Sequence, residues 1–216
     1  MKNNKTIQDL RQDYSQSKLD LADLHKNPMK QFELWWNAAI ASEILEPNAM
    51  TLATVDKKGI PSARIVLLKE LRKKGLVFYT NYKSKKAQDI NQNKNVALVF
   101  LWKKLQRQVR IQGVIKKISE EDSLKYAQTR PIKSQMGAWV SQQSKVVKDR
   151  KKLEKKMAHL TKKYGDQDSM PKPPFWGGYI VKPVVIEFWQ GRRSRLHDRF
   201  QYSKSKDGWD IDRLSP

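Results

Sequence analysis

The densest group of residues that could do chemistry lies near the carboxyl end of the chain, where Arg195, His197 and Arg199 alternate with Leu196 and Asp198. In a strand, the three cation-capable side chains project from one face and the other two from the opposite face. Cations in a row repel one another, and an anionic ligand would remove that cost. The spacing therefore predicts a site for an anion, in which His197 could also handle a proton. The alternative is that His197 is a hydrogen-bonded structural histidine.

A second candidate begins at Ser84, which is followed by Lys85 and Lys86 and comes after a predicted strand that ends in residues 78–81. Ser84 can cap a helix that starts here. Free backbone amides at a helix start, together with two ammonium groups, suit a phosphate. The same residues also occur on ordinary basic surfaces, so a solvated helix start is the alternative interpretation.

Arg64 and Lys69 bracket the four apolar residues Ile65, Val66, Leu67 and Leu68. In an extended chain their separation spans roughly 16 Å, so one anion could not comfortably bind both cations. Their opposite parity also sends them to different faces, unless the strand bulges or ends at Lys69. They are either two separate ligand contacts or two surface cations that flank a core strand.

Tyr126, Arg130 and Ser134 form a third polar group. Tyr126 and Arg130 are four residues apart and share a helix face, while Ser134 follows Pro131 and can cap a new helix. A hydroxyl, a guanidinium and a capped helix start together predict a phosphate site separate from the one at Ser84.

Several kinds of chemistry are excluded by what the chain lacks. It has no cysteine, and its three histidines, His25, His159 and His197, are scattered. Disulfides, thiolate metal sites and a cysteine nucleophile are therefore excluded, and no metal-ligand spacing is present. There is no glycine-rich phosphate loop and no Gly-x-Ser-x-Gly elbow. Redox chemistry would have to come from a bound organic cofactor.

The chain of 216 residues carries a net charge of +22, from 44 Lys and Arg against 22 Asp and Glu, which favours anionic partners such as nucleic acid. Many of the lysines, however, lie in the polar stretch 145–163 and are interpreted as an exposed, solvated helix face. No apolar run approaches the roughly 20 residues of a membrane span. Residues 1–13 have no apolar segment typical of a secretory signal. We expect a cytoplasmic protein without a membrane or nucleic-acid partner.

These side chains must be positioned by a mixture of helices and strands. Asn27 and Pro28 predict the start of a helix, whose apolar residues recur at helical spacing: Phe32, Trp35, Trp36, Ala39 and Ile40. Further helices are predicted after Ser84, after Ser119 and from Ser134 through Trp139. Strands are predicted at residues 50–55, 63–68, 76–80, 96–102, 108–115, 175–181, 184–190, 195–202 and 209–211, with a turn at 56–59. The pattern predicts an α+β fold of antiparallel strands, whose sheet closes on itself to hide its edges.

From about residue 10 to residue 216 the chain resembles the pyridoxamine 5'-phosphate oxidase family. The segments that carry the resemblance are 64–69, 78–81, 107–109, 137–144, 175–178, 187–191, 195–200 and 211–214. Each is weak alone, but their order and spacing together are specific. The resemblance implies an FMN-binding split β-barrel with peripheral helices, a single domain at residues 27–216, and an N-terminal segment at residues 1–26 that acts as a lid.

The resemblance also assigns the site residues one by one. FMN would be bound by Arg64, Ile65, Val66, Leu67, Leu68, Lys69, Tyr79, Thr80, Lys85, Lys86, Gln108, Gln143, Ser144, Trp189 and Arg199. The substrate would be bound by Arg11, Tyr14, Lys69, Tyr126, Arg130, Ser134, Arg195 and His197, of which Arg195 and His197 are the catalytic candidates. Arg64 would then serve the FMN phosphate and Lys69 the substrate phosphate.

The implied reaction is the oxidation of pyridoxamine 5'-phosphate or pyridoxine 5'-phosphate at C4' to pyridoxal 5'-phosphate. A hydride passes to N5 of FMN, and O2 reoxidises the flavin and gives H2O2. The resemblance further implies a homodimer with FMN at the interface. Lys85 departs from the family pattern, in which arginine is expected, and lysine cannot form a bidentate fork on phosphate.

Two other functions are compatible with parts of the sequence and can be distinguished from the oxidase that the resemblance implies. A split-barrel flavin protein of another activity, such as an FMN reductase or a haem-degrading relative, would lack the set formed by Tyr126, Arg130 and Ser134. A nucleic-acid binder would be colourless and would bind DNA or RNA with a steep dependence on salt.

Overall fold

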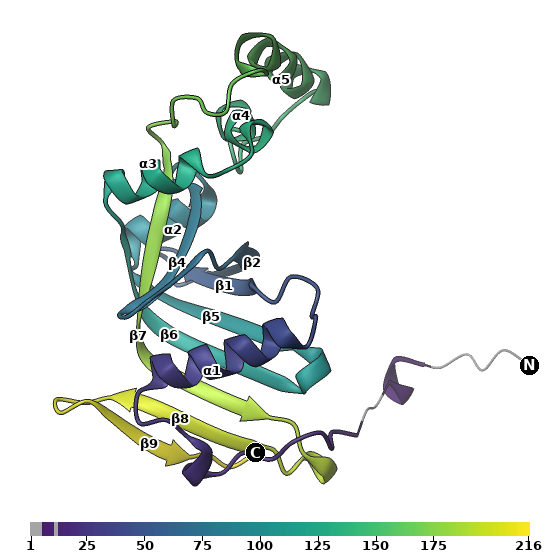
Figure 1. The fold of residues 1–216 in the computed structure, drawn as a ribbon, viewed down its shortest axis with the longest axis vertical. Helices are drawn as coiled ribbons and strands as arrows, with labels where there is room; N and C mark the ends of the chain where they lie inside the picture. The colour runs from purple at the N-terminus through teal and green to yellow at the C-terminus, as the bar shows by residue number, and fades with distance from the viewer. Residues whose placement is uncertain (1–5, 11–12) are drawn as a thin grey trace, which may run out of the picture. The chain divides into compact units, whose positions relative to one another are not determined.

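The computed structural model describes residues 6–10 and 13–216, which form two compact units. Of the described residues, unit 1 contains 6–10, 13–47, 99–111 and 184–216, and unit 2 contains 48–98 and 112–183. The predicted substrate residue Arg11 lies outside the described residues. The strands are β1 (Ala49–Val55), β2 (Pro61–Leu67), β3 (Glu70–Arg72), β4 (Gly75–Asn81), β5 (Asn95–Trp102), β6 (Arg107–Lys117), β7 (Trp176–Gln190), β8 (Asp198–Lys204) and β9 (Trp209–Arg213). The helices are α1 (Pro28–Ala41), α2 (Lys85–Gln92), α3 (Glu120–Gln128), α4 (Ile132–Val140) and α5 (Arg150–Tyr164), as labelled in Figure 1.

The strands pair in the order β2-β1-β5-β6-β7-β4-β3, with β8 on β7 and β9 on β8. The β1–β2, β3–β4, β4–β7, β7–β8 and β8–β9 pairs are antiparallel. Because β2 and β3 are the two ends of this path, the ladder of the described strands is open, and the expectation that the sheet closes on itself is wrong. Between β2 and β3 the chain passes from one ladder to the other: the Leu68 amide donates to the Asn48 carbonyl, and the next amide, of Lys69, donates to Val77.

Unit 1 is held together by an aromatic cluster between α1 and the strands. The Asn27 side chain accepts a hydrogen bond from the Met29 amide, and Pro28 opens α1, as predicted. Phe32 is fully buried with its ring centroid 5.2 Å from that of Phe100, and Trp35 lies 5.1 Å from Phe188. Ile40, which the helical spacing grouped with these aromatics, is instead 52% exposed, one residue past Ala39, the last buried residue of the helix.

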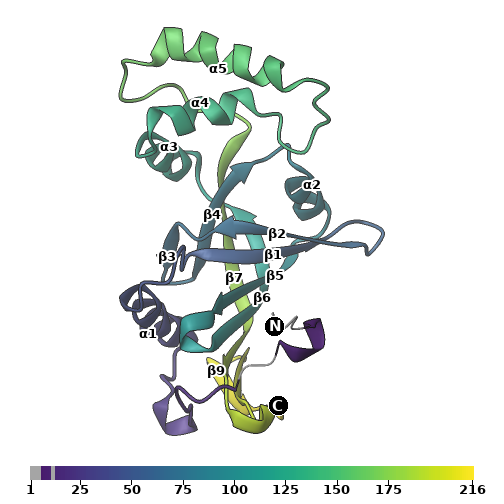
Figure 2. The ribbon, with the colours of Figure 1, turned by 90° about the vertical axis from the view of Figure 1, so that its right-hand side faces the viewer.

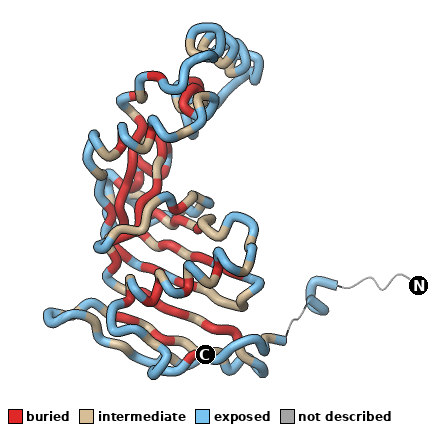
Figure 3. The backbone as a smooth tube through the Cα atoms, in the orientation of Figure 1, coloured by how far each residue is buried: buried red, intermediate tan, exposed pale blue. Residues whose placement is uncertain are grey.

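Unit 2 is built around β4, which is buried along almost its whole length and pairs with β7 from Leu76–Val181 to Asn81–Trp176. Figure 3 shows this run of buried backbone. Helix α3 begins where it was predicted, with the Ser119 side chain accepting from the Asp122 amide. Helices α4 and α5 lie side by side (Figures 1 and 2), and α5 has no buried residue, as expected for a solvated Lys-rich helix. In the described part of the chain, no helix has the length and apolarity needed to cross a membrane.

Three boundaries differ from the prediction. Strand β7 runs continuously through Pro183 instead of breaking into two strands. Pro183 falls between the last pair with β4, at Val181, and the first pair with β8, at Val185, so on this edge its missing N–H costs no ladder bond. Helix α4 begins at Ile132 after Pro131, which places Ser134 inside its first turn rather than at the cap. The third difference is the start of β8, described with the site below.

Candidate functional site

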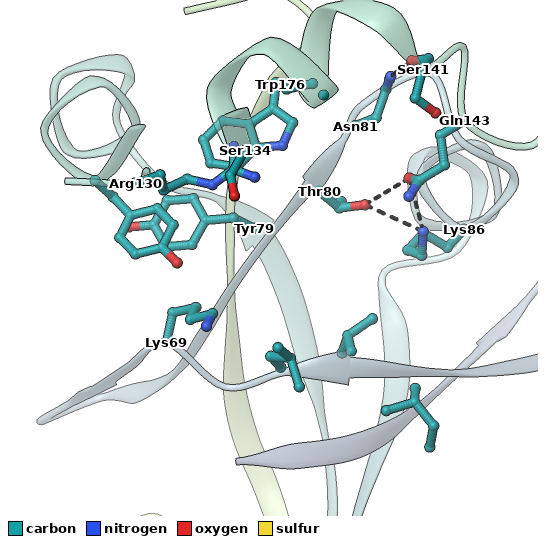
Figure 4. A pocket seen from close by; sticks show the side chains of 16 residues that line it. Lys69, Tyr79, Thr80, Asn81, Lys86, Arg130, Ser134, Ser141, Gln143 and Trp176 are labelled. Carbon is teal, nitrogen blue, oxygen red and sulfur yellow. Dashed lines mark hydrogen bonds between the residues drawn. The ribbon is translucent and has the colours of Figure 1, made fainter. Parts of the chain in front are cut away.

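A cavity of about 510 Å³ lies in unit 2. Strand β2 and Lys69 supply part of its wall, β4 and β7 another, and the helices α2, α3 and α4 with their connections the rest. Its lining residues are Ile65, Val66, Leu67, Lys69, Tyr79, Thr80, Asn81, Lys86, Tyr126, Arg130, Ser134, Gly137, Ala138, Ser141, Gln143 and Trp176. Figure 4 shows their side chains in two polar groups, one around Tyr79 and Arg130 and the other around Thr80 and Lys86.

The position of Lys69 is fixed by the end of β2. That strand stops at Leu67, and the amide of Lys69 turns to β4, where it donates to Val77 at 2.8 Å. Because Lys69 lies beyond the strand, its side chain does not follow the alternation of faces along β2, and it lines the same cavity as Ile65, Val66 and Leu67. Leu68 is buried and does not line the cavity. The sequence left open a bulge or an end of the strand at Lys69; the structure shows an end, two residues earlier, at Leu67.

Lys86 forms the centre of one polar group. Its ammonium nitrogen donates to Gln143 Oε1 at 3.1 Å and to Thr80 Oγ1 at 3.3 Å, and the Thr80 hydroxyl donates to Gln143 at 3.1 Å. Burial, together with the positive charge of Arg64, lowers the pKa of Lys86 to about 8. A buried ammonium group held by neutral oxygens lacks a full counter-charge, so it favours an anion beside it.

Arg64 and Lys85 lie on either side of one buried carboxylate, that of Asp89 on α2. Lys85 donates to Asp89 Oδ1 at 2.5 Å, and the Arg64 guanidinium lies 3.9 Å from Oδ2. Arg64 also donates to Thr54 Oγ1 at 2.7 Å and to the carbonyl of Leu52 at 3.1 Å. The arginine is thus rigidly held, although neither it nor Lys85 is among the residues that line the cavity.

Ser84 provides an independent test of whether this end of unit 2 fits a phosphate. It is the N-cap residue of α2, as predicted, but its side chain makes no capping bond. Its Oγ is buried, and within the described residues it has no hydrogen-bond partner. Buried hydroxyls are nearly always paired in folded proteins, so an unpaired one at the start of α2, two residues before the desolvated Lys86, is a place where a phosphate oxygen would supply the missing partner. The residues therefore fit a phosphate-bearing cofactor.

A stack of aromatic rings forms the other polar group. The Tyr79 ring stacks on Tyr126 with centroids 3.8 Å apart and on Trp176 at 5.4 Å, and the Arg130 guanidinium lies 4.6 Å from the Trp176 centroid. The Tyr79 hydroxyl donates to the Glu70 carboxylate. Burial, reinforced by Glu70, raises the pKa of Tyr79, which keeps this hydroxyl protonated as the donor. The set predicted for a second phosphate, Lys69, Tyr126, Arg130 and Ser134, is brought together in this cavity.

The catalytic candidates Arg195 and His197 lie in unit 1. The predicted strand at 195–202 is wrong in its first part: β8 begins at Asp198, and Arg195 ends a 3₁₀ turn with a positive φ of 60°. The alternation of three cations on one strand face does not exist. Arg195 and His197 nevertheless line a common cavity of about 560 Å³, with Leu10, Asp13, Tyr14, Arg192 and Ser194.

His197 is held by an aromatic contact and a backbone hydrogen bond. Its ring centroid lies 4.6 Å from that of Trp189 and 5.8 Å from that of Tyr14. Its Nδ1 accepts from the Arg192 amide at 3.1 Å, so the neutral ring carries its proton on Nε2. Burial lowers the pKa of His197, and the charges of Arg195 and Arg199 lower it further. The ring is therefore neutral at pH 7.

The remaining predicted residues are dispersed. Arg199 donates to the buried Glu187 carboxylate at 2.8 Å in unit 1, and Gln108 lies half-buried on β6 of the same unit. Ser144 is exposed in a turn with a φ of 70° and does not line the unit 2 cavity. Sequence reasoning missed Glu70 and Trp176. A glutamate directly after Lys69 and a tryptophan at the start of a strand were visible signals, but only the fold brings them to Tyr79.

Comparisons with known proteins identify the family. Residues 37–164 match the family model described as pyridoxamine 5'-phosphate oxidase, and residues 176–216 match the pyridoxine 5'-phosphate oxidase C-terminal dimerisation region. The chain is 51% identical over 212 residues to pyridoxine/pyridoxamine 5'-phosphate oxidase 1 of Ralstonia nicotianae, covering 98% of this chain and 99% of that protein. It is 52% identical over 213 residues to pyridoxine/pyridoxamine 5'-phosphate oxidase of Nostoc punctiforme, covering 98% and 99%. The chain belongs to the pyridoxamine 5'-phosphate oxidase family.

Solved structures confirm the fold class. PhzG from Burkholderia lata 383, in complex with tetrahydrophenazine-1-carboxylic acid, is similar with a TM-score of 0.88 and 26% identity, covering 94% of this chain and 100% of that one. A pyridoxamine 5'-phosphate oxidase-related, FMN binding protein from Nostoc punctiforme has a TM-score of 0.69 at 18% identity, covering 89% and 100%. The second likeness concerns the fold alone. The α+β split-barrel fold predicted for a pyridoxamine 5'-phosphate oxidase family member is therefore the observed one.

Proposed function

We propose that this chain is an FMN-dependent oxidase that converts pyridoxamine 5'-phosphate and pyridoxine 5'-phosphate to pyridoxal 5'-phosphate, with O2 as acceptor and H2O2 as product. The observation that carries the proposal is the unit 2 cavity, which has a cationic group at Lys86 and a second one at Lys69 and Arg130. Two separate anion sites in one cavity suit a reaction in which cofactor and substrate each carry a phosphate. Relatives about 50% identical along the whole chain bear the names of this activity.

FMN would be held through its phosphate by the group around the start of α2. Lys86, the unpaired Ser84 hydroxyl, Arg64 and Lys85 supply the donors, and Thr80 and Gln143 orient the Lys86 ammonium. When bound, FMN supplies the two-electron chemistry that takes hydrogen from C4' of the substrate and delivers it to O2. Lys85 contributes a single point charge already shared with Asp89, so we expect it to contribute less than Arg64 or Lys86.

The substrate phosphate would be bound at the aromatic end of the cavity. Lys69 and Arg130 supply charge, and Tyr126 and Ser134 supply hydroxyls. The Tyr79 ring, stacked against Tyr126 and fixed by Glu70, holds this group in one arrangement before the substrate arrives. Donors that are already in place lose less conformational entropy when the substrate binds. Holding two reactants in the right geometry can contribute about 7 kcal/mol or more to catalysis.

The residues around His197 would complete the site from a second copy of the chain. They are in unit 1, and Arg192, Arg195 and His197 fall within the segment 176–216 that matches the dimerisation region, whereas the lining of the unit 2 cavity comes from unit 2. In a homodimer with FMN at the interface, Arg195 and His197 of one chain would face the substrate bound to the other. His197, neutral with its proton on Nε2, would orient the substrate and exchange a proton with it.

The test combines an absorption spectrum of the purified full chain with a peroxide assay. The proposal expects flavin bands and release of H2O2 on addition of pyridoxamine 5'-phosphate or pyridoxine 5'-phosphate. Tetrahydrophenazine-1-carboxylic acid, the ligand of the 26% identical PhzG structure, is the comparison substrate and should give little turnover. A colourless protein, or a yellow one that oxidises only the comparison compound, would overturn the proposal.

A further inference from the structure

A second concave surface of unit 2 gathers positive charge away from the cavity described above. It has a volume of about 420 Å³. Six of its nine lining residues are cations, and none is acidic: Arg72, Lys73, Lys74, Lys116, Lys117 and Lys182, with Ile118, Ser119 and Ile180. None of the motifs in the sequence drew attention to it, because its lysines come from three segments far apart along the chain.

Rigid backbone brings these segments together. Lys73 and Lys74 form the turn between β3 and β4, Lys116 and Lys117 end β6, and Lys182 lies on β7. Two glycines mark how closely the strands approach β7. A Cβ atom on Gly75 would lie 2.3 Å from the Val181 carbonyl oxygen, and one on Gly113 would lie 2.5 Å from that of Lys182. The lysine stems therefore start from a fixed frame rather than from mobile loops.

The three carboxylates that directly follow the lining residue Ser119 in the chain each form an ion pair with one cation. In the first turn of α3, Glu120 pairs with Lys172 at 2.7 Å, Glu121 with Lys125 at 2.7 Å, and Asp122 with Arg72 at 2.9 Å. Within the described residues, no carboxylate forms an ion pair with Lys73, Lys74, Lys116 or Lys117, and the Lys117 ammonium instead lies 4.2 Å from the Tyr82 ring centroid. The concave surface thus keeps a concentrated positive field.

We propose that this surface is a binding site for a small polyanion that bears two or more phosphate groups, and we call it the lysine pocket. Ammonium groups on flexible stems act as point charges and suit phosphate oxygens, whereas planar carboxylate recognition favours arginine forks. Several lysines need more than one phosphate to balance them. The volume is that of a small-molecule site, which favours a compact oligophosphate over a nucleic-acid strand.

Arg72 joins the lysine pocket to the aromatic stack of the first cavity. Its guanidinium pairs with Glu70 at 2.7 Å, and the same carboxylate accepts the Tyr79 hydroxyl. An anion that draws Arg72 toward the lysine pocket would weaken its hold on Glu70. Binding of an anion in the lysine pocket would therefore alter the hydrogen bond of Tyr79 through two contacts, Arg72 with Glu70 and Glu70 with Tyr79. Binding in the lysine pocket does not itself depend on the function proposed for the first cavity.

The test measures protection of individual lysines. The purified full chain is treated briefly with acetic anhydride, with and without sodium tripolyphosphate, and acetylation of each lysine is followed by mass spectrometry. Lys73, Lys74 and Lys116 should be protected, and the solvated Lys155 and Lys156 of α5 should not. Equal protection of all of them would show only a counter-ion atmosphere and would overturn the proposal.

A matched pair of double variants checks the affinity by calorimetry. Lys74→Gln with Lys116→Gln should weaken tripolyphosphate binding by about tenfold, since each lost cation contributes a factor of a few. Lys155→Gln with Lys156→Gln removes the same charge from α5 and should leave the affinity within about twofold. Similar losses in the two variants would contradict a defined pocket. A single-stranded RNA oligonucleotide serves as a third arm, and tight RNA binding that protects α5 together with the pocket would identify a nucleic-acid surface instead.

Discussion

At the scale of single residues, Lys86 links cofactor binding to pH. Its pKa is lowered to about 8 by burial and by Arg64, so the ammonium form is lost as the pH rises through that value. Only the ammonium form attracts a phosphate, and a bound anion would raise the pKa again. We expect the Kd for FMN to rise severalfold from about pH 7 to about pH 9, measured by quenching of flavin fluorescence on the FMN-free chain.

Two comparisons isolate the role of Lys86. Riboflavin has no phosphate, so its affinity should stay nearly constant over the same pH range. Lys86→Arg keeps the charge at every pH in this range and should remove most of the dependence for FMN. An equal pH dependence for riboflavin and FMN would place the titrating group elsewhere.

The protonation of His197 is expected to set the pH dependence of activity on the acidic side. Burial is the main cause that lowers its pKa, and the cation of Arg195 lowers it further. The ring therefore stays neutral as the pH falls below the ordinary pKa of a histidine side chain. If the neutral ring exchanges a proton with the substrate, activity is lost on the acidic side as His197 becomes charged. Arg195→Gln removes one cation and should shift both the NMR titration of His197 and the acidic limb of kcat/KM to higher pH.

Truncation at His197 separates its chemical role from folding. His197→Ala should lower kcat by about 10² or more while FMN stays bound, because the unit 2 residues proposed to hold FMN are unchanged. The other two histidines, His25 and His159, leave the spectrum simple, and the lost resonance in His197→Ala assigns the one being titrated. If His197→Ala and Arg195→Gln both turned over substrate at the original rate, His197 and Arg195 would be excluded from catalysis.

At the scale of elements, the segment that carries Tyr14 is fastened to unit 1 at defined points. The Gln106 side chain accepts from the amides of Ser15 at 2.9 Å and Gln16 at 3.2 Å, and Asp198 accepts from the amide of Leu19 at 3.0 Å. Gly191 leaves room for the Tyr14 ring, since a Cβ there would lie 2.8 Å from its Cγ. These contacts hold Tyr14 against Trp189, at a centroid distance of 5.7 Å.

Gly191→Ala should therefore loosen this segment without unfolding the strands. We expect faster proteolysis near Tyr14 and a several-fold increase in KM, because the added methyl group displaces the ring from its place beside His197. A double-mutant cycle gives the control: once Tyr14→Ala has removed the ring, the Gly191→Ala change should have little further effect. A full additional loss in that background would mean that the methyl group acts through Gln106 instead.

The elements that the sequence predicted well are those set by contacts within a few residues. The cap of Asn27 on the Met29 amide, the cap of Ser119 on the Asp122 amide and the Asp56 turn, whose side chain accepts from Lys58 and Ile60, are all local. The family and its split-barrel fold were likewise recognisable from the order of short segments. What failed depends on distant partners: β8 starts only where β7 pairs with it, and the two ends of the sheet, β2 and β3, are set by which strands each of them pairs with. For the same reason Glu70 and Trp176 could not be assigned to the site from sequence.

At the scale of the whole molecule, the residues predicted to bind FMN and those predicted to bind substrate are each divided between the two compact units. The assignment of each residue to FMN or substrate stays a prediction. So does the interpretation of residues 27–216 as a single domain. The net charge of +22 has a simpler consequence, because both proposed ligands and the oligophosphate are anions that such a field draws toward the protein. The field also predicts that association rates fall as salt is added, whichever site is filled.

The proposed homodimer makes a prediction that no single-chain site shares. One variant carries Arg195→Ala in unit 1, and a second carries Lys69→Ala with Arg130→Ala in unit 2, so that each homodimer is inactive. When the two are unfolded and refolded together, about half of the dimers contain one chain of each kind, and one of the two sites in such a dimer has every residue intact. Peroxide release should therefore return to about a quarter of the unmutated level. If all the site residues came from one chain, every site in the mixture would carry a defect, and the mixture would stay as inactive as its parents.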